Sequence, residues 1–156
     1  MIIRNAEEKD IAGINVLLRQ VLDVHHAGRP DLFRAQAKKY DDAQLAQIIR
    51  DPDKPIFVAI DELGEIAGYA FCIVQRRVSD PILTDILTLY IDDLCVAEQC
   101  RGQRIGRTLY EYVVQYAKRI GCYNLTLNVW ACNENAMRFY QNCGLTPQKI
   151  GMEKIL

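Results

Sequence analysis

Apolar residues recur along this chain with two different spacings, and each spacing predicts a different kind of element. Behind Asp10, a good helix N-cap, apolar residues recur three and four positions apart, which predicts one face of a helix. These residues are Ile11, Ile14, Leu17, Leu18, Val21 and Leu22. Unbroken apolar runs at residues 56–60 and 66–74 predict strands, and the turn-forming residues 61–65 between them predict a hairpin.

The rest of the chain continues to alternate between strand and helix. Strands are predicted at residues 2–4, about 86–96 and 123–130, with one or two more after residue 143. Helices are predicted from Asp41 or Asp42 to Ile49, and at residues 105–120 and 133–143. Residues 25–33 contain Gly28 and Pro30 and are predicted to form a loop. Because antiparallel hairpins come first, the order predicts a mixed α/β fold rather than a purely parallel doubly wound one.

Length and composition narrow the class of protein. The chain has 156 residues and is 50% hydrophobic, so residues 1–156 are predicted to form a single domain with an ample core. A formal net charge of −1 implies no general polyanion-binding surface, so no nucleic-acid partner is expected. The N-terminus lacks a signal-peptide pattern and no apolar run could span a bilayer. We therefore expect a cytoplasmic protein without membrane association.

Six cysteines and two histidines raise the question of disulfides or a metal site. No C-x-x-C pair occurs and the two histidines are adjacent, so metal-ligand spacing is absent and no metal is expected. Without a secretory signal, reduced and buried thiols are the expectation.

The hexapeptide Arg101-Gly102-Gln103-Arg104-Ile105-Gly106 lies between an apolar run and a predicted helix. A Gly-rich turn that opens a helix leaves several backbone N–H groups without intrahelical partners. The helix dipole adds partial positive charge, so an anion such as a diphosphate is the natural occupant. Arg101, Arg104 and Arg107 add full charges to this phosphate cradle. The alternative is a solvated basic helix start.

The spacing of the cradle resembles a known coenzyme signature. The Lys-Ser/Thr ending of a P-loop and the G-x-G-x-x-G of dinucleotide folds are both missing. The hexapeptide instead resembles the coenzyme A signature of the GNAT superfamily of N-acetyltransferases, Q/R-x-x-G-x-G/A, with Arg101 first and Gly106 last. Arg104 occupies the middle Gly position. Only its backbone amide is needed there, so we expect binding to survive if Arg104 adopts the loop geometry.

A second block, residues 133–145, resembles the family's C-terminal signature N-x-x-A-x-x-F/L-Y-x-x-x-G-F/L. Asn133 is a good N-cap, Ala136 and Tyr140 share a helix face, and Gly144 can end the helix in a left-handed conformation. Residues 3–11 resemble the usual family opening, I-R-x-A-x-x-x-D, and residues 144–154 its close. The resemblance covers nearly the whole chain.

The resemblance implies a fold and an activity. The fold is a central mixed, mostly antiparallel sheet of six or seven strands flanked by about four helices. Two strands, one ending near Val96 and one starting near Tyr123, would splay apart and hold the pantetheine arm. The activity is transfer of an acetyl group from acetyl-CoA, without a metal, directly to a primary amine of an unidentified small molecule, peptide or protein. The implied coenzyme site comprises Leu94, Cys95, Val96, Arg101, Gly102, Gln103, Arg104, Ile105, Gly106, Arg107, Asn133 and Tyr140.

An amine acceptor needs a base, and Asp92 and Asp93 are the candidates. A lysine-like amine is neutral in roughly one part in a thousand at pH 7, so a carboxylate that takes its proton assists attack. Strand alternation places residues 90, 92, 94 and 96 on one face, so Asp92, beside Tyr90, is predicted to carry more of the pH dependence. A β-bulge in this strand would reverse the assignment.

Tyr140 is the candidate acid. The departing thiolate needs a proton or a hydrogen bond, and a phenol of pKa about 10 can donate at neutral pH. The family commonly places a tyrosine beside the sulfur. A backbone N–H near Val96 would meet the oxyanion. The alternative for Tyr140 is a buried packing aromatic.

The family usually builds its acceptor site after the first helix, where this chain has His25, His26, Arg29 and Phe33. With Tyr90 they form the candidate acceptor-binding set, and either histidine is an alternative base. The competing interpretation is a structural loop in which Arg29 pairs with Asp31 and Phe33 fills the core.

Two other functions stay open at this stage. One is a non-catalytic acyl-CoA-binding regulatory module, against which Tyr140 and the acidic pair argue. The other is the same machinery with another donor, such as succinyl- or propionyl-CoA. A homodimer is compatible with every alternative.

Overall fold

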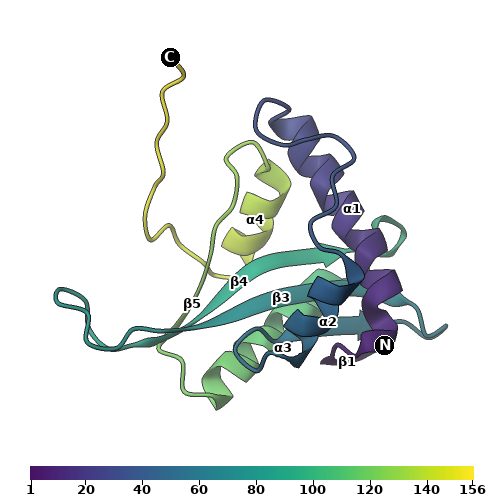
Figure 1. The fold of residues 1–156 in the computed structure, drawn as a ribbon, viewed down its shortest axis with the longest axis horizontal. Helices are drawn as coiled ribbons and strands as arrows, with labels where there is room; N and C mark the ends of the chain where they lie inside the picture. The colour runs from purple at the N-terminus through teal and green to yellow at the C-terminus, as the bar shows by residue number, and fades with distance from the viewer.

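A computed structural model describes all of residues 1–156, and its centre is one five-stranded sheet (Figure 1). The strands lie in chain order: β1 (Ile2–Asn5), β2 (Ile56–Ile60), β3 (Ile66–Arg76), β4 (Leu87–Val96) and β5 (Asn124–Leu127). Neighbouring strands are antiparallel except β4 and β5, which are parallel. The predicted mixed, mostly antiparallel fold class is therefore confirmed.

Helices cover both faces of the sheet. They are α1 (Ile11–Gly28), α2 (Asp42–Arg50), α3 (Ile105–Arg119) and α4 (Glu134–Asn142). α1 and α2 pack on one face, where Ile14, Leu17 and Leu45 meet Tyr69 and Phe71. The opposite face is covered by α3, whose apolar residues Leu109 and Val113 contact Leu89 and Ile91 of β4. α4 lies beside the end of the sheet where β4 and β5 separate (Figure 1).

Two helix starts settle details that the sequence left open. Asp41 is the N-cap of α2, because its side chain accepts a hydrogen bond from the Gln44 N–H at 2.7 Å. Asp10 stands at the N-cap position of α1, but its carboxylate accepts from Arg4 and from the Glu7 N–H instead. α1 also runs on to Gly28, so the predicted loop at residues 25–33 is wrong in its first part. His25 and His26 lie on the last helical turn.

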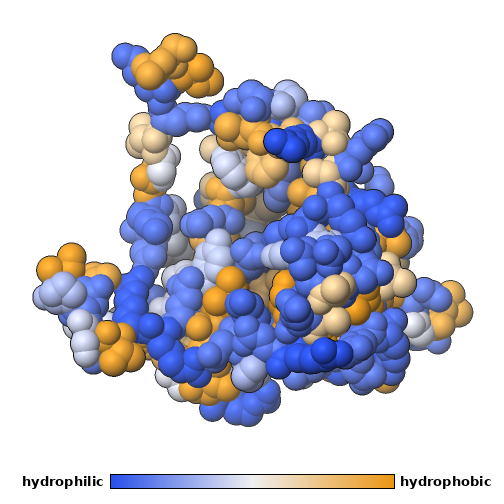
Figure 2. Space-filling model, viewed as in Figure 1, coloured by the Kyte–Doolittle hydropathy of each residue, from blue (hydrophilic) through white to orange (hydrophobic).

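The predicted strand count is wrong at the C-terminal end. Residues 144–156 form no strand, and the sheet has five strands rather than six or seven. No backbone hydrogen bond is made beyond Leu145, and Pro147 lacks an N–H to donate. The C-terminal tail, residues 146–156, is extended and passes the end of α1, where Glu153 pairs with Arg29, and apolar side chains at its end stand clear of the body (Figure 2).

A β-bulge interrupts β4 at the acidic pair. Phe71 pairs with Asp93 and Cys72 pairs with Ile91, so Asp92 is the extra residue in the register. A bulge exchanges the faces of the residues that follow it. Leu94 accordingly packs in the α3 core with Leu89 and Ile91, although strict alternation would separate it from them. The prediction that residues 90, 92, 94 and 96 share one face is therefore wrong.

Candidate active site

The site lies where β4 and β5 separate. The two strands pair only from Thr88–Asn124 to Ile91–Leu127, and β5 ends there, three residues short of its predicted end. Beyond Ile91 the outer edge of β4 has no partner strand. The Ala97 N–H bonds to the Ala67 carbonyl on the inner edge, so alternation turns the backbone groups of Leu94 and Val96 to the open edge. The predicted splay is confirmed.

Cys95 was predicted, with Leu94 and Val96, to belong to the coenzyme site, but it faces away from the open edge. Its side chain is buried in the core under α1, with its sulfur 3.9 Å from the Leu17 carbonyl oxygen. Burial raises the pKa of this thiol to about 12, so it stays protonated at neutral pH. All six cysteines are free, and Cys72 and Cys95 alone are fully buried. The expectation of buried thiols is wrong for the other four.

The cradle has the backbone geometry that anion binding needs. Gly102 and Arg104 have φ angles of +79° and +63°, in the left-handed region, and α3 begins immediately afterwards. Arg104 therefore adopts a left-handed loop conformation, at the position where the signature that the hexapeptide resembles has glycine. The first backbone bond into the helix runs from the Thr108 N–H to the Arg104 carbonyl, which leaves the N–H groups of Ile105, Gly106 and Arg107 without a backbone acceptor.

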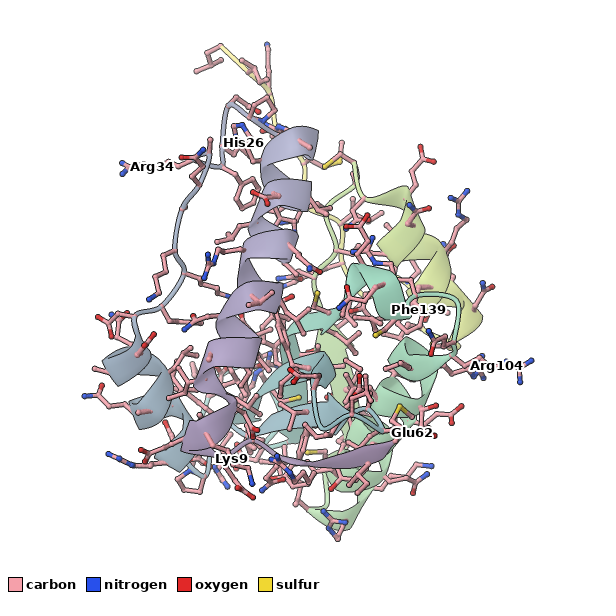
Figure 3. The ribbon with its side chains drawn as sticks, turned by 90° about the vertical axis from the view of Figure 1, so that its right-hand side faces the viewer. Lys9, His26, Arg34, Glu62, Arg104 and Phe139 are labelled. Atoms are coloured by element: carbon pink, nitrogen blue, oxygen red, sulfur yellow. The ribbon has the colours of Figure 1, made fainter.

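The three cradle arginines are placed differently. The Arg101 Nε donates to the Val96 carbonyl at 3.4 Å, which ties the cradle to the end of β4. Arg107 is engaged by Glu111 at 2.9 Å and by the Asn142 carbonyl at 3.3 Å. Arg104 makes no side-chain hydrogen bond and extends away from the domain (Figure 3). Arg101 and Arg104 are thus the two cradle arginines without a carboxylate partner, and Gln103 is exposed between them.

Gly106 holds α3 close to its neighbours. A Cβ at this position would lie 3.3 Å from the Val96 Cγ2 and 3.5 Å from the Phe139 Cε2. The glycine therefore lets the start of α3 approach both the end of β4 and α4. Figure 3 shows Phe139 of α4 on the same side of the molecule as Arg104, which directly precedes α3.

The two carboxylates at the bulge have different surroundings. Asp93 accepts a hydrogen bond from the Tyr69 hydroxyl at 2.9 Å on the α1 side of the sheet. Burial raises the pKa of Asp93 above its usual range, against the opposing charge of Lys39 and the Tyr69 bond. Asp92 instead pairs with the Lys39 ammonium at 3.0 Å, and both side chains are about one-third exposed. Its charge also helps to raise the pKa of Tyr90, after burial itself.

Tyr140 and Asn133 occupy α4. The Asn133 side chain accepts from the Ala136 N–H at 3.1 Å, so Asn133 is the predicted N-cap. Burial raises the pKa of the Tyr140 phenol above its usual value, and the nearby charge of Asp93 adds to the effect. None of the hydrogen bonds in the structure uses the Tyr140 hydroxyl, yet this atom is not sealed from solvent. A protonated phenol without a partner is able to donate to a ligand.

The predicted acceptor residues separate into two groups. The His25 and Phe33 rings lie 5.0 Å apart, and Phe33 meets Trp130 edge-on at 5.2 Å. Phe33 therefore joins His25 of α1 to Trp130 of the β5–α4 connection in an aromatic cluster and does not fill the core. Burial lowers the pKa of His25. The side chains of the second group already bond to other residues of the chain.

Arg29 and His26 belong to that second group. Arg29 binds Asp31 at 2.7 Å and also Glu153 of the tail, so the competing interpretation of an Arg29–Asp31 pair is confirmed. His26 bonds through its Nδ1 to the Phe33 carbonyl at 2.7 Å (Figure 3 shows this end of α1). Tyr90 lies on β4 at the edge of the site, where its hydroxyl accepts from the Asn128 amide at 3.3 Å.

Sequence reasoning missed two residues of the site, Lys39 and Tyr69. Tyr69 is fully buried, and Asp93 is the partner of its hydroxyl. A tyrosine inside an apolar strand needs a hydrogen-bond partner for its hydroxyl, and this requirement was the one sign in the sequence that Tyr69 has a polar neighbour. Lys39 lies 53 residues from Asp92, and nothing in its local pattern indicates the contact.

Neither a metal centre nor a membrane span is found in the structure. No group of three or more His, Cys, Asp and Glu side chains is placed to hold a metal ion. None of the helices combines the length and the apolar composition that crossing a bilayer requires.

Comparisons with known proteins agree on one family. A profile described as the acetyltransferase (GNAT) family matches residues 21–145. Glucosamine 6-phosphate N-acetyltransferase of Arabidopsis thaliana is 31% identical over 65 residues, 42% of this chain and 42% of that protein. Streptothricin acetyltransferase of Streptomyces lavendulae is 34% identical over 94 residues, 60% of this chain and 46% of that protein. The matches thus span less than half the length of these two curated relatives.

A solved structure matches over the full length. A mutant of the BH1408 protein from Bacillus halodurans has a TM-score of 0.96 to this chain at 31% sequence identity, covering 100% of this chain and 99% of the other. The overall fold described above is therefore shared with an experimentally determined structure.

Proposed function

The chain belongs to the GNAT family of acetyltransferases, and from this premise we propose that it transfers an acetyl group from acetyl-CoA directly to a primary amine. One observation carries the proposal. Asp93, the unpartnered phenol of Tyr140 and the open backbone edge of β4 converge where the two parallel strands separate. A base, an acid and an oxyanion donor are what acyl transfer from a thioester requires.

Acetyl-CoA fits the groups that the splay and the cradle present. A pantetheine arm carries two amides, which can pair with the open edge of β4 at Leu94 and Val96 as another strand would. The diphosphate would accept from the free N–H groups at the start of α3, assisted by the helix dipole. Arg101 and Arg104 supply the full positive charges. No residue of this set depends on a metal ion.

The β-bulge moves the proposed base from Asp92 to Asp93. Asp92 is neutralised by Lys39, whereas Asp93 is held by a neutral phenol and has a raised pKa. A carboxylate whose pKa moves toward neutrality is a stronger base at working pH. Asp93 would take the proton from the attacking amine, and a backbone N–H near Val96 would meet the oxyanion. Tyr140 would then donate to the coenzyme A thiolate.

The acceptor is proposed to enter between α1 and α4. His25, Phe33 and Tyr90 border this side of the site, and the carboxylates favour a cationic amine. Two relatives are named for transfer to glucosamine 6-phosphate and to streptothricin, chemically unlike molecules. The proposal is therefore a small primary amine, and the identity of the acceptor is an experimental question.

Titration calorimetry and a turnover assay test the proposal together. The wild-type protein should bind acetyl-CoA. A screen of primary amines should find acceptors whose acetylation releases coenzyme A. The same amines should raise the melting temperature, because a ligand that binds the native state stabilises it. Asp93→Asn and Tyr140→Phe should bind acetyl-CoA with wild-type affinity but turn over slowly. Binding without turnover on any amine, with wild type and variants alike, would instead favour a regulatory module. Faster turnover with succinyl- or propionyl-CoA would revise the donor.

A further inference from the structure

One primary amine of the chain already lies inside the proposed site. The Lys39 Nζ is 3.0 Å from the Asp92 Oδ2, and 32% of the lysine side chain is exposed. The exposed fractions of Lys9 and Lys38 are 67% and 57%. Lys39 belongs to the connection between α1 and α2, so its ammonium reaches β4 from a segment 53 residues away in the sequence.

Packing of the neighbouring residue keeps this lysine over the bulge. The ring of Tyr40 stacks on Phe71, with centroids 6.0 Å apart and planes inclined by 17°. Phe71 is the register partner of Asp93, so Tyr40 is anchored beside the proposed base. The Lys39 Nζ also lies 5.4 Å from the centroid of the Tyr40 ring, within range of a cation–π contact.

The charges around Lys39 are those an acceptor amine would meet. It faces Asp92 and Asp93 on β4 and His25 on α1, with the Tyr40 ring beside it. Burial lowers the pKa of Lys39, but the hydrogen bond that Lys39 donates to Asp92 and the charges of Asp93 and Asp92 outweigh it and raise the pKa overall. The ammonium in turn favours the ionised form of Asp93. The charge of Asp93 also raises the pKa of Tyr140. The amine of Lys39, the proposed base Asp93 and the proposed acid Tyr140 therefore lie around the same bulge.

We propose that Lys39 is an internal acceptor, so that the protein acetylates its own Lys39 when acetyl-CoA is bound and no external amine is present. The inference rests on the proposed function. The Lys39 Nζ forms a bond to the acetyl carbon as the thioester C–S bond breaks. The Lys39 ammonium gives one proton to Asp93, so that a neutral Nζ attacks. The second proton leaves Nζ for solvent as the amide forms, while Tyr140 supplies a proton to the departing thiolate and is reprotonated from solvent. The products are Nε-acetyl-Lys39 and coenzyme A, and the amide leaves Asp92 without its cation.

Lys38 provides a control inside the same molecule. It precedes Lys39 directly, is more exposed, and pairs with Asp42 at 3.2 Å rather than with the carboxylates of β4. Uncatalysed acetylation by a thioester favours the more accessible amine, so it would modify Lys38 before Lys39. Catalysed transfer within the site has the opposite order.

The experiment is acetyl-CoA added to the purified full-length protein without an acceptor, followed by mass spectrometry. Peptides are prepared with a protease that cuts beside acidic residues, because acetylation blocks cleavage at lysine. Lys39 should be modified well before Lys38, at a first-order rate that does not change with protein concentration. Lys39→Arg should abolish the early addition of one acetyl group to the intact mass, whereas Lys38→Arg should not. Asp93→Asn should slow the modification by about a hundredfold, the low end of general base catalysis.

The outcomes separate this inference from the proposed function. Turnover on external amines with Lys39 unmodified would overturn the inference alone. Modification of Lys38 first, or an equal rate in Asp93→Asn, would show uncatalysed chemistry and also overturn it. Failure to bind acetyl-CoA would overturn both. Tyr140→Phe is the second slow variant if Asp93→Asn does not fold, as judged by circular dichroism.

Discussion

Replacing Asp93 with Asn should remove most of the turnover, whereas the same change at Asp92 should remove little. Asn retains an oxygen that can accept from the Tyr69 hydroxyl, so the buried bond survives and only the proton acceptor is lost. A general base contributes about 10²–10⁴-fold, which is ~2.7–5.4 kcal/mol in transition-state free energy. This loss should appear in kcat while the affinity for acetyl-CoA stays unchanged.

The expected loss at Asp92 is smaller because of its surroundings. Asp92→Asn breaks one ion pair with Lys39, and the two side chains are 28% and 32% exposed. Pairs exposed to this degree contribute ~0.2–1 kcal/mol, so the effect should stay within about fivefold and fall on KM rather than kcat.

The pH–rate profile distinguishes the two carboxylates further. Transfer needs ionised Asp93, so turnover falls as the pH drops through its pKa, which burial raises above the usual carboxyl value. Lys39, His25 and Tyr69 oppose this rise, and the charge of Asp92 adds to it. Asp92→Asn should therefore move the acidic limb to lower pH without removing it, and Asp93→Asn should abolish it. The assay is coenzyme A release with a verified acceptor. Loss of the limb in Asp92→Asn alone would refute the assignment drawn from the bulge.

Three further predictions concern acid catalysis, loop strain and stability. Tyr140→Phe should lower kcat by about a hundredfold, because the general acid is lost, while the acetyl-CoA affinity measured by calorimetry stays unchanged. Wild-type turnover in this variant would show that Tyr140 is only a packing residue. Arg104→Gly should remove a left-handed non-glycine conformation costing ~1 kcal/mol and raise the melting temperature by about 2–4 °C; an unchanged melting temperature would show that the loop is not strained. Asp93→Asn should also melt higher than wild type at pH 7, because a carboxyl whose folded pKa is raised destabilises the fold once ionised. This difference should shrink as the pH falls through the Asp93 pKa, and a lower melting temperature at pH 7 would contradict the burial argument.

Local residue patterns were enough to predict most of the elements and the parts of the site that lie on one element. Helical and strand spacing depend on near neighbours, so the start of α1, the β2–β3 hairpin and α3 were predicted close to their observed positions. The cradle was predictable because a strand, a Gly/Arg turn and a helix follow one another directly. Asn133 and Tyr140 share the short helix α4, and the N-cap role of Asn133 follows from the residue type.

Tertiary structure decided everything that depends on pairing between distant segments. A bulge arises from the register of β3 against β4, and this one exchanged the faces expected for the residues around Asp92 and Asp93, so that Asp93 is the proposed base. The unpaired state of the tail could not be predicted, because a terminal segment forms a strand only where the folded sheet leaves an edge available to it. The contacts of Lys39 with Asp92 and of Tyr69 with Asp93 join segments that only folding brings together. Local spacing carries no information about such partners, because they are set by which surfaces the whole chain can bury at once.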